Sequence, residues 1–173
     1  MRFPDSSGAY TGPSQVAPAD IIALDLDEAV LRWPIRLLEQ QGPEEEPRFR
    51  AMRVRILQGS LAQFDSRLRG LDAIVAAEVI EHLDEATLEA FGRVVLGRYR
   101  PNKLLVTTPN YAFNCNFPGA DTRQGFYKDV TGRTDRWFRH DDHRFEFTPS
   151  EFSAWCDALA AREGYDVEVG GIG

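Results

Sequence analysis

The chain has 173 residues, of which 43% are hydrophobic, and its formal net charge at pH 7 is −7. This length and composition allow one buried core, and nothing in them indicates more than one domain. The acidic balance excludes a protein that attracts long nucleic acid through a broad basic surface, so a nucleic-acid substrate would have to be held locally.

The N-terminal segment, residues 1–20, is polar and rich in Pro, Gly, Ser and Ala. It has neither a basic start nor an apolar stretch, so no secretory signal is predicted, and no later segment is long and apolar enough to span a bilayer. Cys115 and Cys156 lack metal-type spacing and are expected to be reduced thiols. We therefore expect an irregular N-terminal segment and a soluble protein, cytoplasmic or nuclear, without a membrane partner.

Strands and helices are predicted to alternate along the chain. An apolar run over 21–25 predicts a strand that ends in an acid, and apolar residues at helical spacing predict a helix over 28–41. Further strands are predicted over 54–57, 72–76 and 104–107, which are short apolar runs. This alternation is typical of an α/β fold with a parallel sheet.

The C-terminal half is predicted to add two helices and a strand. An amphipathic pattern over 85–96 indicates a helix packed on the sheet. The run 148–151, Thr-Pro-Ser-Glu, is typical of a helix start with Thr148 as the cap, and this helix is expected to reach about Ala161. A final strand is predicted over 165–169.

The segment 109–147 has little periodicity, and a loop of that length in a compact domain is usually functional or disordered. It follows the carboxyl end of a strand, where open α/β sheets bind ligands, so we expect it to be functional. Cations alternate with aromatic rings over 123–144, a pattern that would suit an unpaired nucleotide. Nearby acids nearly cancel those cations, and on this pattern alone a solvated loop is the simpler interpretation.

Two carboxylates and an imidazole lie close together in the run 78–83, Glu-Val-Ile-Glu-His-Leu. On a helical turn Glu78, Glu81 and His82 would share one face, where they could converge on a cation. His143 ends a long polar stretch and is the best candidate to close such a site. The alternative is a solvated helix start, with its acids at the positive end of the helix.

Asp25 stands where nucleotide-binding α/β folds hydrogen-bond the ribose of a cofactor, at the end of a strand and before a helix. The spacing also fits a helix cap, a role in which we expect Asp27. The run Gln58-Gly59-Ser60-Leu61 follows the next predicted strand and could contact an adenine or form a plain turn.

Five runs in this order carry a family resemblance: Ala23-Leu24-Asp25-Leu26-Asp27, Gln58-Gly59-Ser60-Leu61, Glu78-Val79-Ile80-Glu81-His82-Leu83, Thr108-Pro109-Asn110-Tyr111 and Asp142-His143-Arg144-Phe145-Glu146-Phe147-Thr148. Together they resemble the small-RNA 3′-terminal 2′-O-methyltransferases, which modify the 3′ ends of microRNAs, siRNAs or piRNAs with S-adenosylmethionine. The acid-rich run is shared with other methyltransferases, whereas its combination with the Pro-Asn-Tyr and Asp-His-Arg-Phe-Glu runs is specific. The resemblance extends from about residue 21 to residue 173.

The resemblance implies a class I S-adenosylmethionine methyltransferase with a Rossmann-like α/β sheet, in a partial domain over 21–173. It implies that a divalent metal, Mg²⁺ or Mn²⁺, is bound by Glu78, Glu81, His82 and His143, the two histidines being the catalytic residues. Asp25 would hold the ribose of S-adenosylmethionine, with Ser60 and Leu61 beside its adenine. The substrate would be a small RNA 3′ end, brought to a monomeric enzyme directly or by a protein partner.

The implied chemistry is physically sensible, because a cation bound to both terminal hydroxyls would lower the pKa of the 2′-hydroxyl. Only a free 3′ end presents adjacent 2′ and 3′ hydroxyls. The metal would therefore supply both activation and selectivity for RNA ends.

Two elements of the parent fold have no predicted counterpart in the chain. One is the first strand with its Gly-rich turn, which lies at the middle of the sheet, and the other is the last, antiparallel strand. The sequence thus predicts a truncated sheet. One alternative is an inactive homologue that binds RNA ends or a protein. Another is a small-molecule O-methyltransferase, and the presence of the run around His143 argues against that one.

Overall fold

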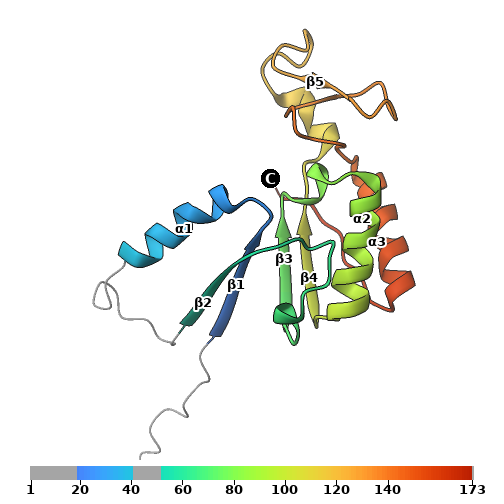
Figure 1. The fold of residues 1–173 in the computed structure, drawn as a ribbon. Helices are drawn as coiled ribbons and strands as arrows, with labels where there is room; N and C mark the ends of the chain where they lie inside the picture. The colour runs from blue at the N-terminus through green and yellow to red at the C-terminus, as the bar shows by residue number, and fades with distance from the viewer. Residues whose placement is uncertain (1–18, 41–51, 173) are drawn as a thin grey trace, which may run out of the picture. The chain divides into compact units, whose positions relative to one another are not determined.

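The computed structural model describes residues 19–40 and 52–172. They form an α/β structure that divides into two compact units between Gly59 and Ser60 (Figure 1). The predicted irregular segment 1–20 lies almost wholly outside the described residues, as does the break expected after the first helix. The predicted domain limits therefore stay a prediction.

The first unit contains two parallel strands and one helix. β1 (Ala19–Asp25) pairs with β2 (Met52–Gln58) in a register that sets Asp25 opposite Gln58. α1 (Glu28–Gln40) follows β1, and the predicted elements of this unit are confirmed. Asp27 caps the helix as expected, because its carboxylate accepts the N–H of Ala29 at 2.7 Å.

The second unit is built on another parallel pair. β3 (Ala73–Ala77) pairs with β4 (Lys103–Thr107), and Ile74 and Ala76 of β3 are buried while Val75 is exposed. The strands are those predicted, within one or two residues. Buried side chains of two helical segments that lie beside this pair, Phe91 and Leu159 among them, belong to the same core (Figure 1).

The helix predicted over 85–96 is confirmed but is longer and not uniform. α2 (Glu85–Gly92) continues as a π-helix, η3 (Arg93–Tyr99), and ends at Arg100, whose φ is 49°. Asp84 caps α2 by accepting the N–H of Thr87 at 2.8 Å. A Cβ added at Gly92 would lie 2.6 Å from Leu159 Cδ1, so the missing side chain lets α2 pack closely on the C-terminal helix.

The C-terminal helix α3 (Pro149–Glu163) begins with the predicted capping box. The hydroxyl of Thr148 accepts the N–H of Glu151 at 3.3 Å, and the Glu151 carboxylate accepts the N–H of Thr148 at 2.8 Å. Gly164, with a φ of 76°, ends the helix.

The strand predicted over 165–169 is wrong, because this segment has no regular secondary structure. Its first N–H, that of Tyr165, closes α3 by donating to Ala160 O at 2.9 Å, and the Tyr165 hydroxyl donates to Pro101 O at 2.8 Å. Tyr165 is thus tied to the end of a helix, and Val167 and Val169 remain exposed.

The parallel strands of the described residues form two separate pairs, β1 with β2 and β3 with β4. A third sheet is a short antiparallel hairpin of β5 (Tyr127–Lys128) and β6 (Trp137–Phe138). The α/β class is confirmed, whereas the predicted absence of a central strand stays a prediction. None of the helices in ranges 19–40 and 52–172 is long and apolar enough to cross a membrane.

The long loop after β4 begins and ends at one place in the second unit. Tyr111 donates its N–H to Phe147 O at 2.8 Å, and Asn110 forms an isolated parallel bridge with Phe147. Between these anchors lie a 3₁₀ segment, η4 (Tyr111–Asn116), and the β5–β6 hairpin. The loop therefore extends from the carboxyl end of β4, the position expected of a functional segment (Figure 1).

Candidate metal centre

Glu78 is the first polar residue after β3, and it does not lie on a helical turn. Its φ is 53°, in the left-handed region, and its N–H donates to Thr107 O at 3.0 Å. The 3₁₀ turn η2 (Ile80–His82) begins two residues later. The prediction that Glu78 shares a helical face with Glu81 and His82 is therefore wrong, because the left-handed backbone turns Glu78 away before the helical turn begins.

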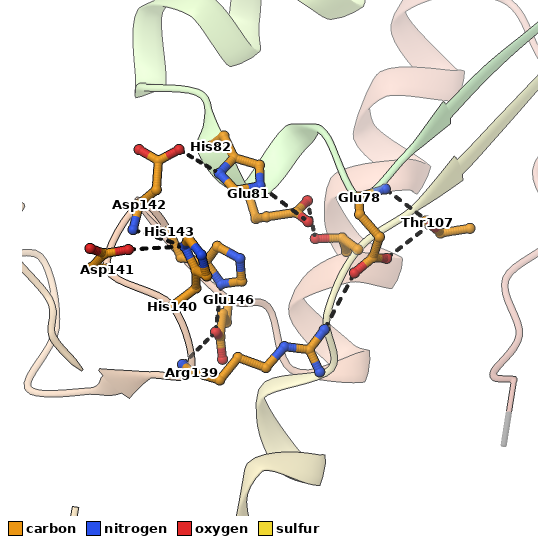
Figure 2. A network of polar contacts seen from close by, with 11 residues as sticks. Glu78, Glu81, His82, Thr107, Arg139, His140, Asp141, Asp142, His143 and Glu146 are labelled. Atoms are coloured by element: carbon orange, nitrogen blue, oxygen red, sulfur yellow. Dashed lines mark hydrogen bonds and ion pairs between the residues drawn. The ribbon is translucent and has the colours of Figure 1, made fainter. Parts of the chain in front are cut away.

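The Glu78 carboxylate has its own partners. It accepts a hydrogen bond from Thr107 Oγ1 at 3.0 Å and pairs with the Arg139 guanidinium at 3.3 Å. Figure 2 shows Arg139 extending from the long loop to reach it. Glu78 would have to give up contacts to Arg139 and Thr107 before it could bind a cation.

Glu81 is buried with one carboxylate oxygen unpaired. Thr108 Oγ1 donates to Oε2 at 3.1 Å, whereas Oε1 has no hydrogen-bond partner among the described residues. Burial raises the pKa of Glu81, and the negative charge of Glu78 raises it further. A cation would satisfy the unpaired oxygen and offset the desolvation of the carboxylate.

His82 directs its two ring nitrogens to two carboxylates. Nδ1 lies 3.0 Å from Asp142 Oδ2, and Nε2 lies 3.9 Å from Glu81 Oε1. The side chain is half-buried, at 34% exposure.

His143 comes from the long loop, as the sequence predicted. The main chain next to it is fixed on η2, because the N–H of Arg144 donates to Glu81 O at 2.7 Å. Its buried ring lies 5.0 Å from that of His82, measured between centroids. The ring Nδ1 is 2.7 Å from Glu146 Oε1 (Figure 2).

Three residues thus converge: Glu81, His82 and His143 each offer a ligand atom, and these atoms lie within 4.8 Å of one another. One carboxylate oxygen and two imidazole nitrogens are a donor set that suits Mn²⁺, Zn²⁺ or a similar divalent cation. The buried, unpaired Glu81 Oε1 fits the same interpretation. Glu78 is not part of this group, and its role as a fourth ligand stays a prediction.

Sequence reasoning gave no role to two carboxylates that contact the histidines, Asp142 and Glu146. Burial alone would raise the pKa of Glu146, but hydrogen bonds from His143, the Arg139 N–H and Asn114 hold it below its ordinary value. Both residues stand in the run 142–148 that carries the family resemblance, but nothing in that run showed that they contact the histidines.

Comparison with known proteins gives consistent relatives. The Small RNA 2′-O-methyltransferase of Xenopus tropicalis is 36% identical over 154 residues, which are 88% of this chain and 38% of that protein. A crystal structure of the methyltransferase domain of bacterial CtHen1 matches with a TM-score of 0.61 and 30% identity, over 89% of this chain and 70% of that one. This chain belongs to the small RNA 2′-O-methyltransferase (HEN1) family.

The predicted family is thereby confirmed, and with it the α/β fold of the HEN1 methyltransferase domain. A crystal structure of small RNA methyltransferase HEN1 matches with a TM-score of 0.69 and 30% identity, over 91% of this chain and 19% of that chain. No family model matches the chain. The chain spans less than two fifths of the curated HEN1 relative from Xenopus tropicalis, 38% of its length.

The residues predicted to bind the HEN1 cofactor lie at the end of β1 and directly after β2. Asp25 ends β1, and its Oδ1 accepts the N–H of Asp27 at 2.8 Å. Ser60 Oγ accepts the N–H of Ala62 at 3.1 Å, with Leu61 half-buried beside it. No hydrogen bond to Asp25 Oδ2 is found among the described residues. The assigned roles of these three residues stay predictions.

In this HEN1 family member, the alternating cations and aromatic rings of the long loop contact each other. Arg136 lies 4.6 Å above the Tyr111 ring and donates to both carboxylate oxygens of Glu151 at 2.8 Å, and Arg123 lies 4.9 Å from the Trp137 ring. These pairs fix the loop to α3 and to itself. They favour the simpler interpretation of a structural, solvated loop over a series of nucleotide-stacking positions.

Proposed function

We propose that this chain transfers the methyl group of S-adenosylmethionine to the 2′-hydroxyl of the 3′-terminal nucleotide of a small RNA, in a metal-dependent reaction. The observation that carries the proposal is the convergence of Glu81, His82 and His143 from the end of β3 and the long loop. Membership of the HEN1 family supports the methyl donor and the RNA substrate.

Glu81, His82 and His143 would hold the divalent cation, and Glu78 would join them after release from Arg139. Such a cation lowers the pKa of a ribose hydroxyl bound to it. The chain's own contribution is to hold the ligands: Thr108 fixes one oxygen of Glu81, and the long loop supplies His143. The donor set accepts Mn²⁺ readily and Mg²⁺ less well, because Mg²⁺ prefers oxygen ligands.

Selectivity for the RNA end follows from the same site. A terminal nucleotide with both ribose hydroxyls free can bind through two adjacent oxygens, whereas an internal nucleotide cannot. The base takes no part in this contact, so we expect selectivity for the end without selectivity for sequence.

For the cofactor we propose that Asp25 hydrogen-bonds the ribose of S-adenosylmethionine and that Ser60 and Leu61 contact its adenine. The position of Asp25 at the carboxyl end of a parallel strand supports its role. We further propose that the two parallel strand pairs correspond to parts of a class I methyltransferase sheet whose central and antiparallel strands the described residues do not supply.

A second candidate is a non-catalytic module that keeps the metal centre and binds RNA ends or a protein. The observation in its favour is that each parallel sheet among the described residues has only two strands. Binding of S-adenosylmethionine distinguishes the candidates, because only the enzyme requires it.

The test is transfer of a labelled methyl group from S-adenosylmethionine to a short RNA in the presence of Mn²⁺. Three matched RNAs would be compared, with a free 3′ end, a 2′-deoxy terminal nucleotide and a 3′-phosphate. We expect labelling of the first alone, and none after the metal is chelated. Labelling of the 2′-deoxy RNA, or labelling that survives chelation, would overturn the proposal, and metal binding without cofactor binding would favour the non-catalytic module.

A further inference from the structure

Glu146 is a fully buried carboxylate behind the candidate metal centre, with a side-chain exposure of 0%. Its Oε1 accepts the N–H of Arg139 at 2.9 Å and lies 2.7 Å from His143 Nδ1. Its Oε2 accepts a hydrogen bond from the Asn114 side-chain amide. Three separate positions of the long loop therefore meet on this one side chain.

These contacts determine which nitrogen of His143 carries a proton. A backbone N–H and a side-chain amide N–H both donate to Glu146, and two such donors favour the ionised carboxylate, which only accepts. Beside such a carboxylate the imidazole nitrogen 2.7 Å away acts as the donor, and we therefore assign the proton to Nδ1. The other nitrogen, Nε2, keeps the lone pair that a metal requires.

Asp142 stands in the same relation to His82. Its Oδ2 is 3.0 Å from His82 Nδ1, while His82 Nε2 is the nitrogen 3.9 Å from Glu81 Oε1. The difference lies in solvent access, because the Asp142 side chain is 60% exposed. Water can replace Asp142 as an acceptor, but it cannot reach the buried Glu146.

We propose that Glu146 and Asp142 are positioning residues that hold both imidazoles of the centre protonated on Nδ1, with Nε2 free for the cation. Glu146 is the principal one, because it is buried and orients the whole loop segment around His143. This inference rests on the metal centre of the proposed function, and assigns a role to two side chains that are not themselves ligands.

The test is titration of Mn²⁺ into the full chain and into three variants: Glu146→Gln, Asp142→Asn and the control Glu151→Gln. The control makes the same chemical change in a carboxylate that binds Arg136 and caps α3 without contacting an imidazole. Loss of a carboxylate behind a histidine ligand typically weakens metal binding about 10–100-fold, and we expect this for Glu146→Gln. We expect a smaller loss for Asp142→Asn, and unchanged Mn²⁺ affinity for the control.

The second readout is the tautomer of each histidine, from nitrogen chemical shifts of the metal-free protein. We expect His82 and His143 as Nδ1–H tautomers in the native chain, and a population of the other His143 tautomer in Glu146→Gln. A merely structural role would leave the tautomers unchanged, as in the control.

The possible failures are distinguishable. If the native chain binds Mn²⁺ and Glu146→Gln retains both its affinity and the Nδ1–H tautomer, the inference is overturned while the proposed function stands. If the native chain binds no Mn²⁺, the proposed metal centre fails instead. If Glu146→Gln does not fold, the native chain and Asp142→Asn decide the inference. A native His143 protonated on Nε2 would overturn it. A native His143 protonated on Nδ1, together with weaker Mn²⁺ binding by Asp142→Asn, would support it.

Discussion

At the scale of single residues, the candidate centre depends on one imidazole that the long loop brings to the end of β3. His143 is buried and lies among Glu81 and His82, whereas the third histidine, His140, is exposed and outside that group. The two loop histidines are therefore close in sequence but differ in environment. This difference provides a matched pair of substitutions.

We predict that His143→Ala weakens Mn²⁺ binding by about 100-fold or more. The effect should exceed that of Glu146→Gln, because His143 is itself a proposed ligand whereas Glu146 only contacts one. Binding of S-adenosylmethionine should be unchanged. Calorimetric titration with each ligand in turn measures both effects. His140→Ala is the control, and equal loss of Mn²⁺ binding in the two variants would contradict the assignment of His143.

A second prediction concerns the ion pair of Glu151 with Arg136. The guanidinium hydrogen bonds lower the pKa of Glu151 from its ordinary 4.5 to about 2, against the opposing effect of burial. Because the folded pKa is depressed, the pair stabilises the fold above about pH 4.5, and this contribution is lost as the pH falls toward 2. Glu151 is 41% exposed, so solvent screening reduces the contribution to on the order of 1 kcal/mol.

Urea unfolding of native chain and Glu151→Gln at pH 7 and pH 3 measures this contribution. The two proteins should differ more at pH 7 than at pH 3. A difference that does not depend on pH would mean that the carboxylate acts only through its capping contacts.

At the scale of elements, local signals decided which helices and strands could be predicted. The capping box is a signal only four residues long, from Thr148 to Glu151, and it predicts where α3 begins. Short apolar runs predict β3 and β4 in the same way. The strand predicted over 165–169 failed because Tyr165 is bound to Ala160 and Pro101, contacts that an apolar pattern does not reveal. The π-helical continuation of α2 likewise has no recognised sequence signal.

We predict that Thr148→Ala lowers the free energy of unfolding by about 1 kcal/mol, because α3 loses the hydroxyl that accepts the Glu151 N–H. Ser150→Ala is the matched control, since its hydroxyl is exposed and contacts only that of Thr148 among the described residues. The control should change stability by less than about 0.5 kcal/mol. Thermal or urea unfolding of the pair checks this, and equal effects would argue against the cap.

At the scale of the whole molecule, the fold class and three of the four proposed ligands could be predicted, largely because the motifs resemble a known family. Glu78 departs from the prediction because its left-handed backbone follows from β3 and Thr107, which spacing along the chain cannot show. Glu146 received no role because a glutamate in a polar loop resembles a solvated acid until the loop folds back and buries it. Burial by distant segments is the physical information that the sequence pattern lacks.

The proposed cofactor and metal residues come from different segments, which predicts separable losses. Asp25→Ala should weaken binding of S-adenosylmethionine about tenfold or more, since a hydrogen bond to a charged group contributes about 1.5–3 kcal/mol. It should leave Mn²⁺ binding unchanged, the reverse of His143→Ala. The same two calorimetric titrations check this, and loss of both ligands by Asp25→Ala would indicate unfolding or a wrong assignment.

The most direct test of the central claim is the anomalous diffraction of manganese in crystals of the full chain. We predict one strong manganese peak bonded to Glu81 Oε1, His82 Nε2 and His143 Nε2, with Glu78 either joining it or remaining on Arg139. A chain that crystallises in Mn²⁺ with no peak at these three atoms, or with its manganese bound elsewhere, would contradict the account.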